Sequence, residues 1–341
     1  MKHKFALCAF LFVLLIILTS TVACLGKPAP GVQWYRTFGG GSGNSVQQTT
    51  DGGYIVCGFI RSYGAGGHDI LLIKTDADGN KLWDKTFDFR RHDYGNSVQQ
   101  TADGGYIICG TSGSYYGAGD ADVWLIKTDA DGNKLWDKIF GGKKYNEGNS
   151  VQQTADGGYI ICGTTGSYYY NSDVWLIKTD ADGDKLWEKT FGGTGLNGGN
   201  SVQKTTDGGY VVCGYTELYG NSDIDVWLIK TDADGNKLWD KTFGFRKSDY
   251  GYSVQQTADG GYIICGYIIS RWHAKFSISK LLLIKTDTKG NKLWNKAFGS
   301  VIGYTHGFSV RQTTDGGYIV CGYEYTLGPS EVLLLKLASE Q

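Results

Sequence analysis

The stretch SVQQTADGGYIICGTSGSYYGAGDADVWLIKTDADGNKLWDKIF, residues 97–140, decides the fold because nearly the same text recurs along the chain. Its DGGY marker occurs six times, with successive copies 51 to 56 residues apart. The copies begin at Asp51, Asp103, Asp156, Asp207, Asp259 and Asp315. A fixed period of this size indicates a repeat architecture in which each copy is one supersecondary unit.

Each copy contains four segments that are typical of short strands. NSVQQT is polar but extended, GYIICG and DVWLIKT are apolar runs, and KLWDKTF alternates around a Trp. The segments TADGG and DADGN separate them, and their Asp-Gly pairs favour tight turns. No stretch after residue 25 shows the 10–12 residues of 3.6 periodicity that a helix requires. The sequence therefore predicts an all-β fold with four antiparallel strands in each copy.

The two ends of the repeated region are out of phase with each other. Residues 32–38, VQWYRTF, match the fourth strand, whereas residues 331–337, EVLLLKL, match the third and no Trp strand follows them. Each strand type therefore occurs six times, and one sheet is shared between the two ends. This sharing favours a closed ring over an open solenoid. We predict a six-bladed β-propeller over residues 32–337, whose last blade is closed by the N-terminal strand.

The N-terminus predicts export. A basic start and an uncharged run over residues 5–25 precede small residues, which is typical of a signal peptide over residues 1–23, although the run is also long enough for an uncleaved membrane anchor. Thr21-Val22-Ala23-Cys24 partly resembles a bacterial lipoprotein processing site, so lipid attachment at Cys24 is a third alternative. Residues 24–31 then form a linker and residues 338–341 a tail. All three alternatives predict an extracytoplasmic protein, secreted or anchored at the cell surface, that meets membrane only through its N-terminal segment.

The charge balance argues against nucleic-acid partners. The chain has 33 Lys and Arg against 34 Asp and Glu, a formal net charge of −1. Bulk charge of this size attracts neither nucleic acid nor acidic lipid.

The cysteines that recur in the repeats predict buried thiols and no disulfides. One occupies the same place in the second strand of each copy, so neighbours lie a whole blade apart, beyond the roughly 7 Å that a bridge allows. These cysteines are Cys57, Cys109, Cys162, Cys213, Cys265 and Cys321.

The DADGN segments resemble the start of a calcium loop, but no acidic ligands follow them. We therefore interpret them as turns, and we expect neither metal nor cofactor.

The segment T-x-D-G-G-Y-I-I resembles the Asp-box turns of sialidase-like propellers, which are structural. The whole layout over residues 32–337 resembles the secreted β-propeller repeat proteins of bacteria and archaea (the SBBP type) and, more loosely, quinoprotein-type propellers. The resemblance implies an extracytoplasmic binding or surface scaffold and carries over no catalytic residue.

The connections predict where a ligand binds. In a four-stranded antiparallel blade the two tight turns share one end, so the variable connections share the other, and varied loops on a rigid scaffold are typical of binding surfaces. These connections are rich in Tyr, Gly, Ser and Asn, and the one at 267–280 departs most from the repeat. The candidate ligand-binding residues are Arg91, His92, Tyr116, Tyr169, Tyr250, Arg271, Trp272, His273 and Tyr304.

Two functions stay open at this stage. The first is a non-catalytic binding or cell-surface scaffold that recognises an extracellular glycan or protein through this variable face. The second is an extracytoplasmic lyase or hydrolase that uses the same face. The residues that differ between the copies contain no Ser/His/Asp or paired-carboxylate set, which argues against this second function. The inner strands also carry a ring of Gln side chains, which we interpret as hydration around a central channel.

Overall fold

A computed structural model describes residues 34, 36–61, 67–90, 92–113, 121–167, 171–217, 223–245, 248–271, 277–299, 303–326 and 331–339. The chain divides into two compact units, Met1–Thr37 and Phe38–Gln341. In the first unit only Trp34, Arg36 and Thr37 are described, and they are irregular. The predicted leader, with Cys24, lies outside the described residues. In the second unit the described residues form strands and turns and no helix, so none of them supplies a helix able to cross a membrane.

The described residues of the second unit form 23 strands, which we group into repeats 1 to 6. Repeat 1 comprises β1 (Gly41–Gln48), β2 (Tyr54–Arg61), β3 (His68–Thr75) and β4 (Lys81–Phe87). Repeat 2 comprises β5 (Asp93–Gln100), β6 (Tyr106–Ser112), β7 (Asp122–Thr128) and β8 (Lys134–Phe140). Repeat 3 comprises β9 (Tyr145–Gln153), β10 (Tyr159–Ser167), β11 (Asn171–Thr179) and β12 (Lys185–Phe191). Repeat 4 comprises β13 (Asn197–Lys204), β14 (Tyr210–Glu217), β15 (Ile224–Thr231) and β16 (Lys237–Phe243). Repeat 5 comprises β17 (Ser248–Gln256), β18 (Tyr262–Arg271), β19 (Ser277–Thr286) and β20 (Lys292–Phe298). Repeat 6 comprises β21 (Tyr304–Gln312), β22 (Tyr318–Tyr325) and β23 (Glu331–Leu337).

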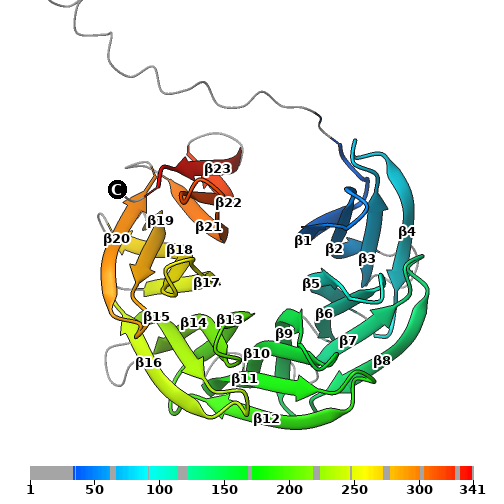
Figure 1. Cartoon of the computed structure of the whole chain (residues 1–341), viewed down its shortest axis with the longest axis horizontal. Coiled ribbons are helices and arrows are strands. Elements are labelled where there is room, and N and C mark those ends of the chain that lie inside the picture. The colour runs from blue at the N-terminus through cyan, green and yellow to red at the C-terminus, as the bar shows by residue number, and fades with distance from the viewer. Residues whose placement is uncertain are drawn as a thin grey trace, which may run out of the picture. The chain divides into compact units, whose positions relative to one another are not determined.

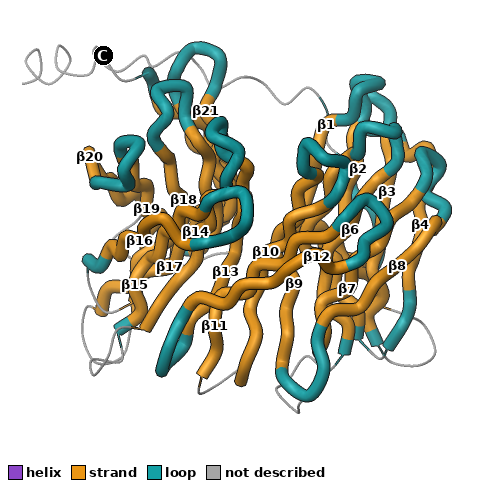
Figure 2. Tube along the Cα trace, turned by 60° about the horizontal axis from the view of Figure 1, so that its bottom comes forward, coloured by secondary structure: helices purple, strands orange, loops and turns teal. Residues whose placement is uncertain are grey.

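Within each repeat the strands pair antiparallel in chain order, which confirms the predicted all-β class and strand pattern. Single parallel contacts, Ile224 with Ser248 and Ser279 with Tyr304, join repeats 4, 5 and 6 edge to edge. The repeats follow an arc around a central opening, with their first strands innermost and their fourth strands outermost (Figure 1). Figure 2 shows the same strands after a turn of 60°, with loops and turns at both ends of the strands.

The residues Asp-Gly-Gly form the turn between the first two strands of each repeat, and the geometry of this turn explains why they recur. In repeat 2, Gly104 has a φ of 85°, which favours glycine. A Cβ on Gly105 would lie 2.2 Å from the carbonyl oxygen of Thr128 and 2.7 Å from Lys127 Nζ, so a side chain has no room there. The buried Lys127 ammonium instead reaches the Asp103 carboxylate at 2.8 Å and the Thr128 carbonyl. This Lys–Asp pair recurs in all six repeats, so in each of them it ties the first tight turn to the end of the third strand.

The DADGN segments are turns, as predicted. In repeat 1, Asp76 Oδ1 accepts hydrogen bonds from the backbone of Asp78 and Asn80, and Oδ2 accepts one from the Asn80 amide. The carboxylate that would begin a calcium loop is therefore used inside its own turn.

The core lies between the repeats, and each of five interfaces buries its own hydrophobic cluster. Between repeats 1 and 2, Ile70 and Leu72 pack with Val98, Ile108 and Trp124. At the inner strands the repeats approach so closely that a Cβ on Gly95 would lie 2.4 Å from Cys57 Sγ. The same Gly–Cys contact recurs at the other four interfaces.

The inner strands are also joined by side-chain hydrogen bonds, which corrects our interpretation of the Gln ring as hydration. Gln47 Oε1 accepts a hydrogen bond from the Gln100 backbone at 2.6 Å, and the equivalent bond recurs at each of the next four interfaces. Ser45 Oγ likewise accepts from the Val98 backbone, again at all five interfaces. The Ser and Gln side chains of the polar segment NSVQQ therefore bond each repeat to the next.

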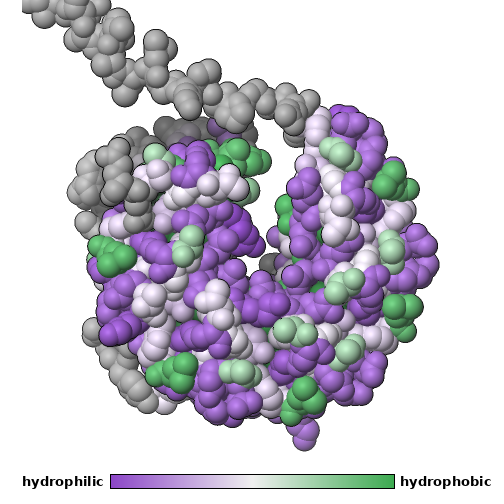
Figure 3. All heavy atoms as spheres, viewed as in Figure 1, coloured by the Kyte–Doolittle hydropathy of each residue, from purple (hydrophilic) through white to green (hydrophobic). Residues whose placement is uncertain are grey.

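The arc is open between repeat 6 and repeat 1, as the ribbon and the space-filling view both show (Figures 1 and 3). Val46 of β1 is 65% exposed, whereas its counterpart Val98 is 6% exposed. Val332 and Leu334 of β23 are 85% and 64% exposed. Trp34 and residues 36–38 form no strand and residues 32, 33 and 35 lie outside the described ranges, so the predicted closure by residues 32–38 stays a prediction.

The predicted free thiols are present in the described part of the chain. Cys57, Cys109, Cys162, Cys213 and Cys265 are free and buried, whereas Cys321, which faces the open seam, is free but exposed. Burial raises the pKa of the Cys57 thiol to about 12, so this sulfur is inert at ordinary pH.

Candidate functional site at one mouth of the channel

One end of the channel departs from the repeat much more than the rest of its wall does. Three residues before the repeated Ser-Val of each inner strand, at the end where the chain enters that strand, the side chain differs from one repeat to the next. In order, these residues are Ser42, Tyr94, Glu147, Gly198, Tyr250 and His306. Across the sheet they pair with Phe59, Thr111, Thr164, Tyr215, Tyr267 and Tyr323. We call these twelve residues the mouth ring.

A pocket of about 220 Å³ lies in the mouth ring at repeats 1 to 3. Its wall combines aromatic rings with amide, hydroxyl and carboxylate groups. The lining residues are Asn44, Phe59, His92, Tyr94, Asn96, Thr111, Gly113, Tyr145 and Glu147. The Phe59 ring meets the Tyr94 ring edge-on, with centroids 4.9 Å apart, so the aromatic part of the wall is fixed by packing.

Two histidines and a tyrosine form a hydrogen-bonded group beside this pocket. His68 Nδ1 lies 3.1 Å from His92 Nδ1 and 3.1 Å from Tyr94 Oη. His68 and His92 also form a parallel bridge between the end of β3 and the start of β5. Because one ring nitrogen must donate and the other accept, the tautomers of the two imidazoles depend on each other.

Glu147 adds a carboxyl group with altered acidity. Burial raises the pKa of Glu147 above its ordinary value, and a hydrogen bond with Asn149 opposes that rise only in part. A carboxyl of this kind holds its proton more strongly than a solvated one and donates hydrogen bonds when protonated.

At repeats 4 to 6 the mouth ring is almost entirely aromatic. The Tyr267 ring stacks on His306 with centroids 3.7 Å apart and on Tyr250 at 5.1 Å. Tyr252 and Phe308, which replace the repeated Asn of the other inner strands, extend the stack. Burial lowers the pKa of His306 to about 4, so the imidazole is neutral at ordinary pH and pairs with Ser279 Oγ at 2.6 Å.

The interior of the channel is more uniform. A cavity of about 440 Å³ is lined by the repeated Ser, Val and Gln side chains and by Arg311. Arg311 Nη1 donates to the Val310 carbonyl at 3.0 Å, and burial lowers the pKa of its guanidinium. The hydrogen bonds between repeats already use the Gln47-type carbonyls, so the variable mouth is the better candidate for recognition.

The structure places four of the nine candidate ligand-binding residues from the sequence. His92 lines the pocket and Tyr250 belongs to the aromatic stack, while Tyr304 stacks on Tyr325 at the start of β21. Arg271 is the last residue of β18. The remaining candidates, together with the possible lipid site, lie outside the described residues: Arg91, Tyr116, Tyr169, Trp272, His273 and Cys24.

Sequence reasoning missed most of the mouth ring. The sequence prediction placed the ligand on the variable connections. It therefore did not include four residues that lie in strands: Phe59, Glu147, Tyr267 and His306. A position-by-position comparison of the repeats contains the signal: the place three residues before Ser-Val varies while its neighbours Gly, Ser and Val recur.

Comparison with known proteins identifies the fold. No protein-family model and no curated protein matches the chain. Among solved structures, a protein of unknown function from Dyadobacter fermentans is 13% identical, with 88% of this chain and 95% of that chain covered and a TM-score of 0.56. The Pan2 WD40 domain of Neurospora crassa is 9% identical, with coverages of 86% and 78% and a TM-score of 0.52. An α-L-arabinanase of Penicillium chrysogenum, in complex with arabinobiose, is 13% identical, with coverages of 86% and 92% and a TM-score of 0.53. WD40 domains are β-propellers, so the likeness shows that this chain has a propeller fold.

Proposed function

We propose that this protein is an exported, non-catalytic propeller that binds an extracellular glycan at the mouth ring. The observation that carries the proposal is the combination of a repeated scaffold with one variable, aromatic-lined concave end. A sugar presents apolar C–H faces and a rim of hydroxyls. The pocket at Tyr94 offers rings for the first and, for the second, the Glu147 carboxyl and the Oδ1 atoms of Asn44 and Asn96, whose Nδ2 atoms donate to the next repeat. The fold is also used for sugars elsewhere, since the arabinanase is complexed with arabinobiose.

Export rests on the predicted leader over residues 1–23. The uncharged run and the small residues before Cys24 support a secreted or surface-anchored location, in which free polysaccharide or a cell-surface glycan is available to the mouth ring.

The working form of the molecule is, in this proposal, a closed six-bladed ring. Repeat 1 keeps Gly43, and repeat 6 keeps Cys321, at the places where the other interfaces bring a Gly and a Cys into contact. Val46, Val332 and Leu334 are apolar at the equivalent core positions although they are exposed. Residues 32–38 match the one missing outer strand. Closure buries these apolar side chains, which is favourable at roughly 25 cal/mol per Å².

The proposal is tested by titrating the purified chain with a panel of soluble polysaccharides and following heat or intrinsic fluorescence. For the polysaccharide that binds, Tyr94→Ala and Tyr250→Ala are expected to weaken affinity at least tenfold, about 1.4 kcal/mol. Leu135→Ala is the matched control, because Leu135 is an exposed apolar residue of the outer strand β8. Binding by no glycan, or equal binding by both Tyr variants, would contradict the proposal.

A second candidate, a lyase or hydrolase acting at the same mouth, is favoured by one observation. His68, His92 and Tyr94 share hydrogen bonds beside Glu147, so a proton donor and a proton acceptor face one pocket. Catalysis predicts that the bound polysaccharide is cut, measured as new reducing ends or as absorbance of an unsaturated product, and that His92→Ala abolishes the cutting. Binding without turnover retains the first function.

A further inference from the structure

The hydrogen bonds that join the repeats leave amide donors on the wall of the channel. Gln47 Oε1 accepts the backbone N–H of Gln100, and because a backbone N–H can only donate, this bond fixes which end of the amide faces the next repeat. The Nε2 group of Gln47, with its two N–H donors, is therefore turned away from that bond, and no described residue accepts from it. The same is true of the other Gln side chains of this kind that line the cavity of about 440 Å³, which are Gln99, Gln152 and Gln203.

The serines of the wall leave hydroxyl donors in the same way. Ser45 Oγ accepts from the Val98 backbone at 3.2 Å, so its one O–H proton remains to be donated, and no described residue accepts it. The equivalent bond is made by the other serines that line the cavity, which are Ser97, Ser150, Ser201 and Ser253. The wall therefore presents hydroxyl donors from five repeats and amide donors from four.

Arg311 brings a positive charge to this wall. It occupies in repeat 6 the place that Gln47 has in repeat 1, and because a guanidinium has no acceptor, it cannot make the bond that Gln makes. Its Nη1 donates to the Val310 carbonyl at 3.0 Å, and no described residue forms an ion pair with it. Since a guanidinium has five N–H donors, most of them remain for a partner in the cavity.

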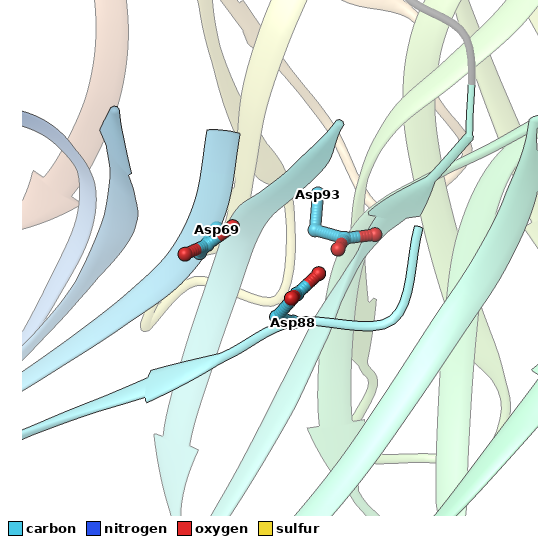
Figure 4. A group of neighbouring side chains, drawn as sticks. All are labelled: Asp69, Asp88 and Asp93. Atoms are coloured by element: carbon cyan, nitrogen blue, oxygen red, sulfur yellow. The ribbon is translucent and has the colours of Figure 1, made fainter. Parts of the chain in front are cut away.

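No carboxylate competes for these donors on the described part of the wall. Apart from Arg311, the lining residues are Ser, Val and Gln. From the repeated Ser to the end of each inner strand, the charged residues are Lys204 and Arg311, and both are basic. The carboxylates of Asp69, Asp88 and Asp93, which lie close together on β3, on the link after β4 and on β5, do not belong to this wall (Figure 4).

We propose that the channel binds an oxyanion, with Arg311 as its charged partner and the Ser and Gln donors around it. A carboxylate, sulfate or phosphate group only accepts hydrogen bonds, which matches a wall that mainly donates, and a guanidinium bonds such a group through two N–H groups at once. An uncharged sugar suits this wall less well, because its hydroxyls must also donate and the Gln47-type carbonyls are already used.

The cavity admits either a free ion or the acid group of a larger molecule. Its volume of about 440 Å³ lies within the roughly 300–1,000 Å³ of small-molecule sites, so it accommodates a sugar acid as well as an inorganic ion with its waters. All of the donors line the cavity in the open arc, so binding requires neither closure of the ring nor a glycan at the mouth ring.

The test is calorimetric titration of the full chain with sodium sulfate, sodium phosphate and sodium glucuronate, with NaCl of the same ionic strength as the reference. We expect one of these anions to bind once per chain and to raise the unfolding temperature more than NaCl does. Sulfate and phosphate stand for a free inorganic ion and glucuronate for the acid group of a sugar, so their relative affinities identify the source of the oxyanion.

Three variants place the site. Arg311→Gln introduces the residue that the other five repeats carry here, so it should fold, and it should weaken binding at least tenfold. Gln152→Glu keeps an oxygen for the Lys204 backbone but adds a negative charge to the wall, so it should also weaken binding at least tenfold. Lys289→Gln, which removes an exposed positive charge from the turn between β19 and β20, is the matched control and should bind normally.

Three results would overturn the site. They are no binding of any of the three anions at millimolar concentration, unchanged affinity in Arg311→Gln, and an equal loss of affinity in Lys289→Gln, which would indicate attraction by net charge alone.

Discussion

Closure of the ring can be tested by a double-mutant cycle at the seam, with Gly43→Ala and Cys321→Ala. In the open arc, a Cβ on Gly43 meets only Val56 Cγ1, at an ordinary 3.4 Å, so the substitution is tolerated. In a closed ring Gly43 takes the place that Gly95 has against Cys57, where a Cβ would lie 2.4 Å from the sulfur. We therefore expect Gly43→Ala to destabilise the protein and Cys321→Ala to relieve much of that effect.

The magnitude follows from the known interfaces. Ordinary carbon contacts are roughly 3.5–4.0 Å, so neighbouring strands must move apart by about 1 Å to admit the methyl group. Overpacking of this kind costs about 1–3 kcal/mol. A propeller of roughly 300 residues has an unfolding entropy of about 0.6 kcal/mol/K, so the unfolding temperature should fall by about 2–5 °C.

The assay is thermal or urea unfolding of the four seam variants, followed by the fluorescence of the repeated Trp residues. Gly95→Ala with Cys57→Ala is the matched reference, because that contact exists in the structure. A coupling free energy between Gly43 and Cys321 of about 0.5–3 kcal/mol, similar to the reference, is expected for a closed ring. A seam cycle that is additive while the reference cycle is coupled would refute the closure.

Two further predictions follow. In the native protein, thiol titration should find none of the six repeat cysteines reactive if the seam closes; reaction of Cys321, the one that is exposed in the open arc, would show that the seam stays open. Acid should destabilise the fold between about pH 4 and pH 2. Hydrogen bonds from Thr49 and Lys74 lower the pKa of Asp51 to about 2. Burial raises the pKa values of Asp103, Asp156 and Asp207, but similar hydrogen bonds outweigh it and lower these values to about 2 as well. A depressed folded-state pKa stabilises the protein above the unfolded value of about 3.8, and this contribution is lost as the pH falls through the folded value. As the pH is lowered over this range, the unfolding temperature of the double variant Asp103→Asn/Asp156→Asn should therefore fall less steeply than that of Asp131→Asn, which removes an exposed carboxylate from a turn. Equal slopes would contradict the role of the Lys–Asp pairs.

The sequence alone determined the strands, the turns and the period. Runs such as YIICG and DVWLIKT form strands, and DGG and DADGN form turns, because these preferences depend on residues adjacent in the chain. The Asp76 carboxylate, for example, accepts three hydrogen bonds from residues two and four positions away. For the same reason the turn interpretation of DADGN was correct. The prediction of free thiols was correct because the period sets the distance between equivalent residues, which places the cysteines of neighbouring repeats a blade apart.

Only the tertiary structure decided what the repeated polar residues do and where the candidate sites lie. Gln47 bonds to Gln100, 53 residues away, and Gly95 packs against Cys57 of the preceding repeat, so their roles appear only when two repeats lie side by side. The mouth ring is likewise assembled from one residue pair of each repeat, and the neighbouring carboxylates of Asp69, Asp88 and Asp93 come from β3, from the link after β4 and from β5. Each of these contacts has one partner in one repeat and the other partner in the next, so the sequence of a single repeat contains only one of the two partners. The physical reason is that a four-stranded sheet buries its faces against other sheets, so packing and recognition arise between copies and not within one.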